Sequence, residues 1–294
     1  MNILITGANG QLGNEFKQFP SSYMQHRFFF TDVISASDEY LDITDKDAVE
    51  EFIIENEIDV VINCAAHTDV KSAEIGPETL ASKLNVHAPL YLSNAIQKRN
   101  GLLIHISTDY VFDGKKNIPY EENDPIGPLN DYGITKLGGE LQIKDRDKTI
   151  IVRTSWLYSY YGKNFVKTII SKLKNKESLN IVDVQIGTPT YAADLALAIM
   201  KIISRYENGT AVYGIFHYSN EGVCTWFEFA KAIAEYSGLY GFADIKPCSS
   251  DEIIDNVKRP TYSVLSKKKI IEEYDVDVPY WRDSLKKCIN KLSK

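Results

Sequence analysis

A tyrosine and a lysine four residues apart, Tyr132 and Lys136, are the residues of this chain whose types and spacing best suit chemistry. On a helix this spacing puts a phenol and an ammonium on one face, one turn apart. A cation close to a phenol favours the phenolate, which predicts a lowered pKa for Tyr132. Such a tyrosine can donate or accept a proton near neutral pH. The spacing is common by chance, so its interpretation depends on the rest of the chain.

A glycine-rich segment near the N-terminus predicts a dinucleotide site. The apolar run at residues 2–6 predicts a buried strand, and Gly7, Gly10 and Gly13 follow it before a stretch of helical character. Glycines at such a turn let a pyrophosphate approach the backbone, and the helix start offers free N–H groups. An ordinary glycine turn is the alternative, which the position between strand and helix disfavours.

Two aspartates could meet the adenosine half of such a cofactor. Asp32 lies near the end of the second strand-like run, where an acid can bind ribose hydroxyls and would repel a 2′-phosphate. This favours NADH over NADPH, and an aspartate that caps a loop is the alternative. Asp42 could reach the adenine edge or cap the helix that starts near Asp45.

Two hydroxyls are expected to share the site with Tyr132. Ser107 and Thr108 follow another strand-like run, and a hydroxyl there could hydrogen-bond a substrate carbonyl. A Ser/Thr turn that satisfies local backbone groups is the alternative. The order of glycine loop, hydroxyls and Tyr-Lys pair along the chain favours the site.

The elements that would position these residues alternate between strand and helix. Strand-like runs lie at 2–6, 27–33, 59–64, 102–107 and 149–154, with helical patterns at 11–19, 46–56, 77–100 and 132–145. This predicts an α/β fold with a Rossmann-type, doubly wound parallel sheet, whose ligands bind at the carboxyl ends of the strands. Residues 1–155 are expected to form this dinucleotide-binding domain.

The second half is less regular and predicts a smaller α/β substrate lobe at residues 156–294. Helical patterns lie at 163–174, 192–206, 225–237 and 284–292, and a strand-like run at 213–218. The boundary is approximate and allows lobes that interleave. A cleft between two lobes is a common place for a small-molecule site.

Composition excludes several classes of protein. The net charge of −7 and the pI near 5.4 argue against nucleic acid as a partner. No apolar stretch approaches the ~20 residues of a membrane helix, and the apolar run at the N-terminus is expected to form a strand, not part of a signal peptide. Four scattered cysteines without a Cys-x-x-Cys pair predict neither a zinc site nor a disulfide framework, and favour the cytoplasm.

The chain resembles the extended short-chain dehydrogenase/reductase superfamily in three features: the glycine loop, the Ser/Thr strand end and the Tyr-x-x-x-Lys spacing. More specific strings resemble the dTDP-4-dehydrorhamnose reductase family, from residue 1 to about residue 290. These are Asn-Cys-Ala-Ala-His-Thr at 63–68, Ser-Thr-Asp-Tyr-Val-Phe-Asp-Gly at 107–114, Val-Arg-Thr-Ser-Trp-Leu-Tyr at 152–158, Gly-Thr-Pro-Thr at 187–190 and Arg-Pro at 259–260.

The resemblance implies that NADPH or NADH reduces the C4 ketone of dTDP-4-dehydro-6-deoxy-L-mannose to dTDP-L-rhamnose. Tyr132 would protonate the new alkoxide, Lys136 would lower the Tyr132 pKa and bind the nicotinamide ribose, and Thr108 would bind the carbonyl oxygen. The implied cofactor contacts are Gly7, Asn9, Gly10, Gln11, Leu12, Gly13, Asp32, Asp42, Ile43, Ala65, Ala66, Tyr132 and Lys136. The implied substrate contacts are Thr108, Asp109, Tyr110, Trp156, Asn164 and Arg259.

Two of these substrate contacts have a physical rationale of their own. Trp156 could stack on a pyranose, with a core tryptophan as the alternative. Arg259 could pair with a pyrophosphate, with a surface arginine before a turn proline as the alternative. His217 at a strand end is expected to be structural.

The chain departs from the family pattern at a few positions. His67 replaces a tyrosine and Lys71 an acid, which puts the nicotinamide contacts and the cofactor preference in doubt. Val184 replaces another acid on the substrate side. Some relatives dimerise around magnesium held by glutamates; Glu15 matches one such position but Ala193 stands at a second, which makes magnesium doubtful and leaves a homodimer possible.

Two rival functions remain. A nucleotide-sugar epimerase or 4,6-dehydratase of the same superfamily is the first, and Tyr110 stands where dehydratases carry a glutamate after Thr-Asp, which argues against dehydration only. A non-catalytic regulatory subunit is the second, and the intact Thr108, Tyr132 and Lys136 argue against it.

Overall fold

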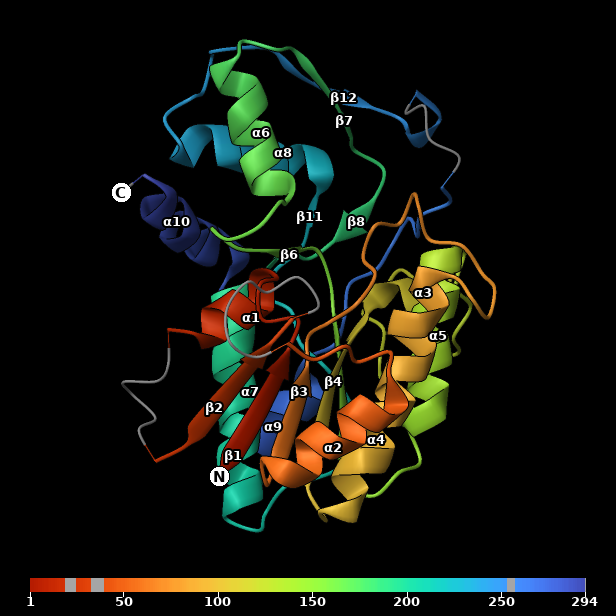
Figure 1. Cartoon of the computed structure of the whole chain (residues 1–294). Helices are drawn as coiled ribbons and strands as arrows, with labels where there is room; N and C mark the ends of the chain where they lie inside the picture. The colour runs from red at the N-terminus through yellow and green to blue at the C-terminus, as the bar shows by residue number, and fades with distance from the viewer. Residues whose placement is uncertain (19–24, 33–39, 253–256, 294) are drawn as a thin grey trace.

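A computed structural model of the chain describes residues 1–18, 25–32, 40–252 and 257–293. Figure 1 shows two parts, a parallel sheet wrapped by helices and a smaller lobe of helices and short strands above it. The predicted α/β architecture, a doubly wound parallel sheet with a smaller lobe, is confirmed.

Six parallel strands form the central sheet in the order β10-β5-β4-β3-β1-β2. They are β1 (Asn2–Thr6), β2 (Arg27–Thr31), β3 (Val60–Asn63), β4 (Leu102–Thr108), β5 (Thr149–Thr154) and β10 (Gly214–His217). Every residue of β3 and β5 is buried, as expected of parallel strands covered on both faces. The chain goes from β1 to β2 on one side and then crosses to β3 on the other. Ligands of such sheets bind at the carboxyl ends beside this reversal.

Alternate side chains of the strands face two helical layers. Ile3 and Ile5 pack with α1 (Gln11–Phe16), α7 (Ala192–Glu207) and α9 (Lys268–Tyr274). Leu4 packs on the opposite face with α2 (Lys46–Glu55), α4 (Ala88–Lys98) and α5 (Asp131–Ile143). Burying one such side chain stabilises the fold by roughly 1.5–3 kcal/mol, so the sheet is a rigid base for its carboxyl-end loops.

The smaller lobe has an apolar core of its own. Its helices α6 (Phe165–Lys174), α8 (Trp226–Tyr236) and α10 (Trp281–Leu292) pack together around Phe229 and Trp281. The paired strands β7 (Leu179–Val182) and β12 (Ile245–Cys248) lie along it, followed by the short turn η3 (Ser250–Glu252). The described part of the lobe also holds four two-residue strands: β6 (Leu157–Tyr158) pairs with β9 (Thr190–Tyr191), and β8 (Ile186–Gly187) with β11 (Cys224–Thr225).

Three elements from the second half of the chain return to the sheet. Strand β10 pairs with β5, and α7 and α9 cover one sheet face. The two parts therefore interleave, and a domain boundary near residue 155 remains a prediction.

The region 77–100 differs from the single helix that its sequence predicts. It contains α3 (Leu80–Ser82), the π-helix η1 (Lys83–His87) and α4. The Thr79 hydroxyl accepts a hydrogen bond from the Ser82 N–H at 3.2 Å, which starts the helix three residues late. π-Helical turns frequently occur at functional sites. Here η1 carries the buried Asn85 toward the loop after β3.

Two predicted boundaries pass beyond the described residues. Phe19 and Val33, the last residues of a predicted helix and a predicted strand, lie outside them, and α1 ends at Phe16 and β2 at Thr31. Within the described ranges, each helix is too short or too polar to cross a lipid bilayer.

Candidate active site

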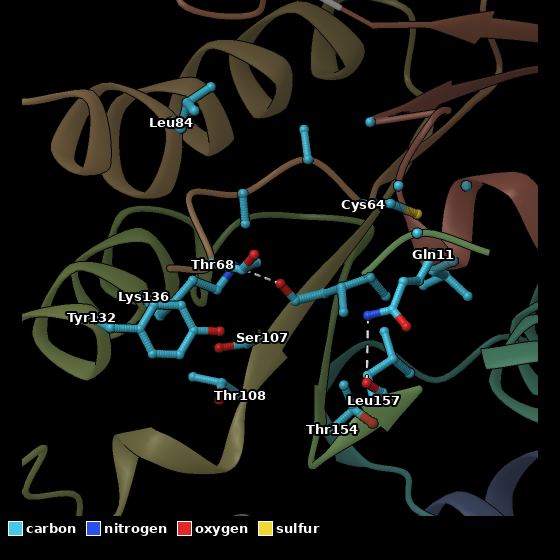
Figure 2. Close-up of a pocket in the computed structure, with 18 of the residues that line it drawn as sticks. Gln11, Cys64, Thr68, Leu84, Ser107, Thr108, Tyr132, Lys136, Thr154 and Leu157 are labelled. Carbon is cyan, nitrogen blue, oxygen red and sulfur yellow. Dashed lines mark hydrogen bonds between the residues drawn. The ribbon is translucent and has the colours of Figure 1, made fainter. Parts of the chain in front are cut away.

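A cleft of about 790 Å³ lies between the carboxyl ends of the sheet strands and the smaller lobe. The glycine loop lines one end of it, and Thr108, Tyr132 and Lys136 line the other. Figure 2 shows Gln11 and Leu157 on one side of this cleft and Tyr132, Lys136 and Thr108 on the other. Segments far apart in sequence thus meet as the motifs predict.

The glycine loop brings bare backbone to the cleft. Gly7 has a φ of +63°, which favours glycine, and a Cβ at Gly13 would lie only 2.4 Å from the Gly7 oxygen. A Cβ at Gly7 would lie 2.7 Å from the Ala65 nitrogen, so the loop also packs closely on the segment after β3. Gly10 stands at the N-cap of α1 without a side chain to cap it. This cradle fits a dinucleotide pyrophosphate.

The residues predicted for the adenosine end divide into two groups. Asp32 and Asp42 line the cleft. The Asn9 N–H donates to Asp32 Oδ2 at 3.0 Å, and Asp42 Oδ1 accepts from the N–H and hydroxyl of Thr44 at 2.9 and 2.7 Å. Ile43 is buried in the core, so only its backbone could meet a cofactor. Asp42 therefore holds its own turn, and Asp45 caps α2.

The loop after β3 is fixed by Asn85. Its Oδ1 accepts from the His67 N–H at 2.9 Å, and its Nδ2 donates to the His67 oxygen at 3.1 Å and the Thr135 hydroxyl at 3.0 Å. Ala65 and Ala66 line the cleft, as predicted. The His67 imidazole contacts Ser72, and Lys71 is exposed.

Helix α5 carries the predicted proton donor. The Asn130 side chain caps this helix by accepting from the Gly133 N–H at 2.9 Å, which places Tyr132 in its first turn. The Tyr132 hydroxyl hydrogen-bonds Thr108, and its ring meets Tyr110 edge-on at 5.7 Å. One turn later, Lys136 Nζ donates to the Ile106 oxygen at 2.7 Å. The predicted trio of Thr108, Tyr132 and Lys136 lines one wall of the cleft.

The prediction that Lys136 lowers the pKa of Tyr132 is wrong. Burial raises the pKa of Tyr132 to about 12, and the hydrogen bond with Thr108 offsets only part of this. The ammonium of Lys136 is bound by the Ile106 carbonyl, and burial lowers the pKa of Lys136 to about 8. A neutral phenol is the form that can donate a proton, so the structure presents Tyr132 as an acid.

A chain of buried polar groups behind Lys136 escaped the sequence analysis. Lys136 Nζ lies 3.4 Å from His105 Nε2, His105 Nδ1 lies 3.0 Å from Asn63 Nδ2, and the Thr6 hydroxyl donates to Asn63 Oδ1 at 2.8 Å. Burial, aided by Lys136, holds the pKa of His105 well below its usual value, so the ring is neutral with a single N–H. The tautomer of His105 is therefore coupled to the charge of Lys136. A lone histidine within an apolar strand was the available signal.

A buried ion pair lies behind Ser107. Arg153 Nη2 and Glu140 Oε2 are 2.7 Å apart, both side chains are almost fully buried, and the Ser107 hydroxyl donates to Glu140 Oε1 at 2.5 Å. His217 Nε2 lies 3.5 Å from Arg153 Nη1, and its Nδ1 lies 3.1 Å from the Tyr120 oxygen. His217 is therefore part of this internal network, as expected, and Ser107 is held by it.

Two stacked indoles form the lobe side of the cleft. The rings of Trp156 and Trp226 are 3.6 Å apart and nearly parallel, and both residues line the cleft. Trp156 has a φ of +47°, a left-handed conformation that costs a non-glycine residue energy and often marks functional sites. Trp226 covers one face of the Trp156 indole, so that face is closed to the pyranose stacking expected from sequence. Trp226 itself was not predicted.

Gly187→Ala is expected to displace the Trp156 indole and raise KM for a sugar nucleotide by roughly 10–200-fold, the cost of a small steric change in a binding pocket. A Cβ there would lie 2.5 Å from Trp156 Cε2. The stacked pair should also lose its exciton signal in circular dichroism. An unchanged spectrum and KM would contradict this role of Gly187.

Other predicted substrate residues are held by protein contacts. Tyr110 lines the cleft and hydrogen-bonds Arg259, which does not itself line the cleft among the described residues. Asn164 caps α6 through the Lys167 N–H at 3.1 Å, and its Nδ2 donates to Gln11 Oε1 at 3.0 Å. Asn164 thereby ties the lobe to the glycine loop.

The other positions compared with the family pattern, Val184, Glu15 and Ala193, lie outside the cleft lining. Val184 is exposed. Glu15 is buried, and its Oε1 accepts from the Ser159 hydroxyl at 2.6 Å. Burial raises the pKa of Glu15, while Ser159 and the nearby Lys291 lower it.

The fold and the site define the class of protein. A short-chain dehydrogenase/reductase has three features that are present here. They are a glycine loop after β1, a reversal of strand order between β1 and β3, and a tyrosine and a lysine on one helix, here Tyr132 and Lys136 on α5, beside a Ser/Thr strand end.

Comparison with known proteins narrows this class. A family model described as the RmlD substrate binding domain matches residues 1–294. The spore coat polysaccharide biosynthesis protein SpsK of Bacillus subtilis is 37% identical over 99% of this chain and 98% of its own. A dTDP-4-dehydrorhamnose reductase of Aggregatibacter actinomycetemcomitans is 37% identical over 97% of each chain.

Solved structures agree with these relatives. A dTDP-4-dehydrorhamnose reductase from Clostridium acetobutylicum has a TM-score of 0.90 and 40% identity over all of both chains. The reductase of the same name from Bacillus anthracis, in complex with NADP, has a TM-score of 0.90 and 36% identity over 99% of each chain. The chain belongs to the dTDP-4-dehydrorhamnose reductase family.

Proposed function

We propose that the protein reduces the C4 ketone of dTDP-4-dehydro-6-deoxy-L-mannose to dTDP-L-rhamnose, with NADPH or NADH as the reductant. The observation that carries this proposal is the buried, neutral Tyr132 hydroxyl bonded to Thr108 in a dinucleotide cleft. The names of the relatives supply the sugar nucleotide.

The chemistry divides between cofactor and protein. A bound nicotinamide supplies the hydride that forms the new C4–H bond. Tyr132 gives its hydroxyl proton to O4, so an O–H bond forms on the sugar as the tyrosine O–H bond breaks. Thr108 hydrogen-bonds the Tyr132 hydroxyl that gives up this proton. Lys136, still largely protonated at neutral pH, would bind the nicotinamide ribose from its place on the Ile106 carbonyl.

The sugar nucleotide would lie against the lobe side of the cleft. Trp156 and Trp226 supply an apolar wall, and the Tyr110–Arg259 pair supplies a hydroxyl and a guanidinium near the reacting end. Arg259 would meet the pyrophosphate only after a side-chain movement. Asn164, as the N-cap of α6, would position the lobe and contact substrate where it lines the cleft.

The two nicotinamide cofactors differ at the 2′ position of the adenosine ribose. Asp32 lines that end of the cleft and would repel a 2′-phosphate. Lys17 Nζ, 2.9 Å from Asn9 Oδ1, places a cation close by. The relative in complex with NADP supports use of the phosphorylated cofactor. We propose that the enzyme acts in the cytoplasm as a homodimer. Ala193, in place of a metal-binding glutamate, argues against magnesium between the subunits.

NADPH and NADH oxidation by the purified protein tests the proposal, with absorbance as the readout. Oxidation is expected with dTDP-4-dehydro-6-deoxy-L-mannose, with dTDP-L-rhamnose as the product by mass spectrometry. UDP- and GDP-linked 4-keto sugars are the matched controls, and a preference for one of them would change the substrate. Conversion of the sugar without net cofactor oxidation would establish an epimerase, and cofactor binding without turnover of any sugar a regulatory subunit.

A further inference from the structure

Asp109 is a buried carboxyl group next to the candidate proton donor. It follows β4 and starts the turn η2 (Asp109–Val111), and only 2% of it is exposed. Its Oδ1 accepts from the Thr108 hydroxyl at 3.1 Å. Its Oδ2 is buried and has no hydrogen-bond partner among the described residues. An unpaired buried carboxylate oxygen is costly, which favours a protonated group.

The surroundings of Asp109 also favour a protonated carboxyl group. Burial raises its pKa to about 7, and the nearby Ser263 and Thr108 hydroxyls lower the pKa by less. The titratable groups around it are Tyr110 on its own turn and Tyr132 on α5, and Asp109 raises the pKa of both phenols. Arg259, from the segment before α9, acts on Tyr110. The carboxyl can therefore change its charge near neutral pH.

The hydroxyl of Thr108 has one proton and two lone pairs, which limits its partners. The Tyr110 N–H already donates to it at 3.2 Å. If Asp109 is ionised, Thr108 must donate to it, and Tyr132 can bond Thr108 only by pointing its own proton there. If Asp109 is neutral, it donates to Thr108, both lone pairs are filled, and Thr108 donates to the Tyr132 oxygen.

We propose that Asp109 is a positioning residue which, when protonated, directs the hydrogen-bond chain from Asp109 through Thr108 to Tyr132 and so frees the Tyr132 proton for the substrate ketone. The Thr108 proton then also stabilises the phenolate that forms on Tyr132. This role rests on the proposed reduction and needs no contact between Asp109 and the sugar.

The proposal has a definite pH dependence. Asp109 is neutral below its pKa, so kcat/KM should fall by about tenfold per pH unit as pH rises above about 7. Asp109→Asn keeps the shape and an N–H donor to Thr108 but cannot ionise. In the kcat/KM profile of Asp109→Asn, the fall should therefore begin at higher pH, near pH 8, where Lys136 loses its proton. At about pH 6, the loss of kcat/KM in this variant should be far smaller than the ~10²–10⁴-fold cost of a missing acid.

The experiment combines pH profiles with infrared spectroscopy. Ser263→Ala removes one contact that lowers the Asp109 pKa and leaves Asp109 itself in place. The fall of kcat/KM with pH should therefore shift to higher pH in this variant. The carboxylic acid C=O band should be present near pH 6 in the parent protein, fade as pH rises through about 7, and be missing in Asp109→Asn.

Three results would overturn the proposal: an unmoved fall of kcat/KM with pH in Asp109→Asn, a loss of activity in this variant as large as the ~10²–10⁴-fold cost of a missing acid, or no band from Asp109 near pH 6. The infrared titration needs no substrate, so it judges Asp109 even if no sugar is turned over. Failure of the proposed function would instead show as the absence of cofactor oxidation by the parent protein.

Discussion

Tyr132→Phe is expected to lower kcat by roughly 10²–10⁴-fold while binding of NADPH stays unchanged. The substitution removes one hydroxyl and keeps the ring that meets Tyr110 edge-on. Because Tyr132 is neutral in the structure, its loss removes a proton donor and not a charge. Steady-state kinetics measures kcat, and quenching of protein fluorescence by NADPH measures binding.

Tyr240→Phe is the matched control. Tyr240 is 66% exposed and lies on the surface of the lobe, so removal of its hydroxyl should leave kcat and cofactor binding as they were. Turnover of Tyr132→Phe at the parent rate would show that the proton for O4 comes from another group.

Glu140→Gln is expected to lower the free energy of unfolding by roughly 3–5 kcal/mol, because it leaves the buried charge of Arg153 unpaired. Both side chains are almost inaccessible to water. The amide also weakens the bond that holds the Ser107 hydroxyl, so a smaller loss of activity should accompany the loss of stability. Urea denaturation followed by circular dichroism measures the change.

The exposed pair of Lys172 and Glu177, 3.2 Å apart, offers the comparison. Glu177→Gln should leave the denaturation midpoint nearly unchanged, since water already screens that pair. Equal effects of the two substitutions would mean that Arg153 finds another partner when Glu140 loses its charge.

The sheet could be predicted because each of its strands is a short apolar run. Residues 60–63 and 149–154 are buried throughout, so their composition alone marks them as central strands. The two-residue strands of the lobe and the π-helix could not be predicted, because contacts between distant segments hold them. Asn85, for example, bonds His67 and Thr135, eighteen and fifty residues away.

The site could be predicted only where a local string carries it. Gly7, Thr108, Tyr132 and Lys136 lie where their motifs indicate. The predicted direction of the Tyr132 pKa shift was wrong, because the spacing of two side chains on a helix face does not reveal burial. It also does not reveal a carbonyl, such as that of Ile106, that binds the lysine instead. Trp226 and His105 were missed for a similar reason, since their partners lie on other elements.

The interleaving of the two parts has a mechanical consequence. The chain crosses from sheet to lobe near residues 155, 220 and 280 and back near 190 and 260. Each crossing is a separate tether, so the lobe cannot swing out on a single joint as a lid would. Opening of the cleft therefore bends several crossings at once, and a single protease cut in one crossing would leave the lobe fastened by the other four.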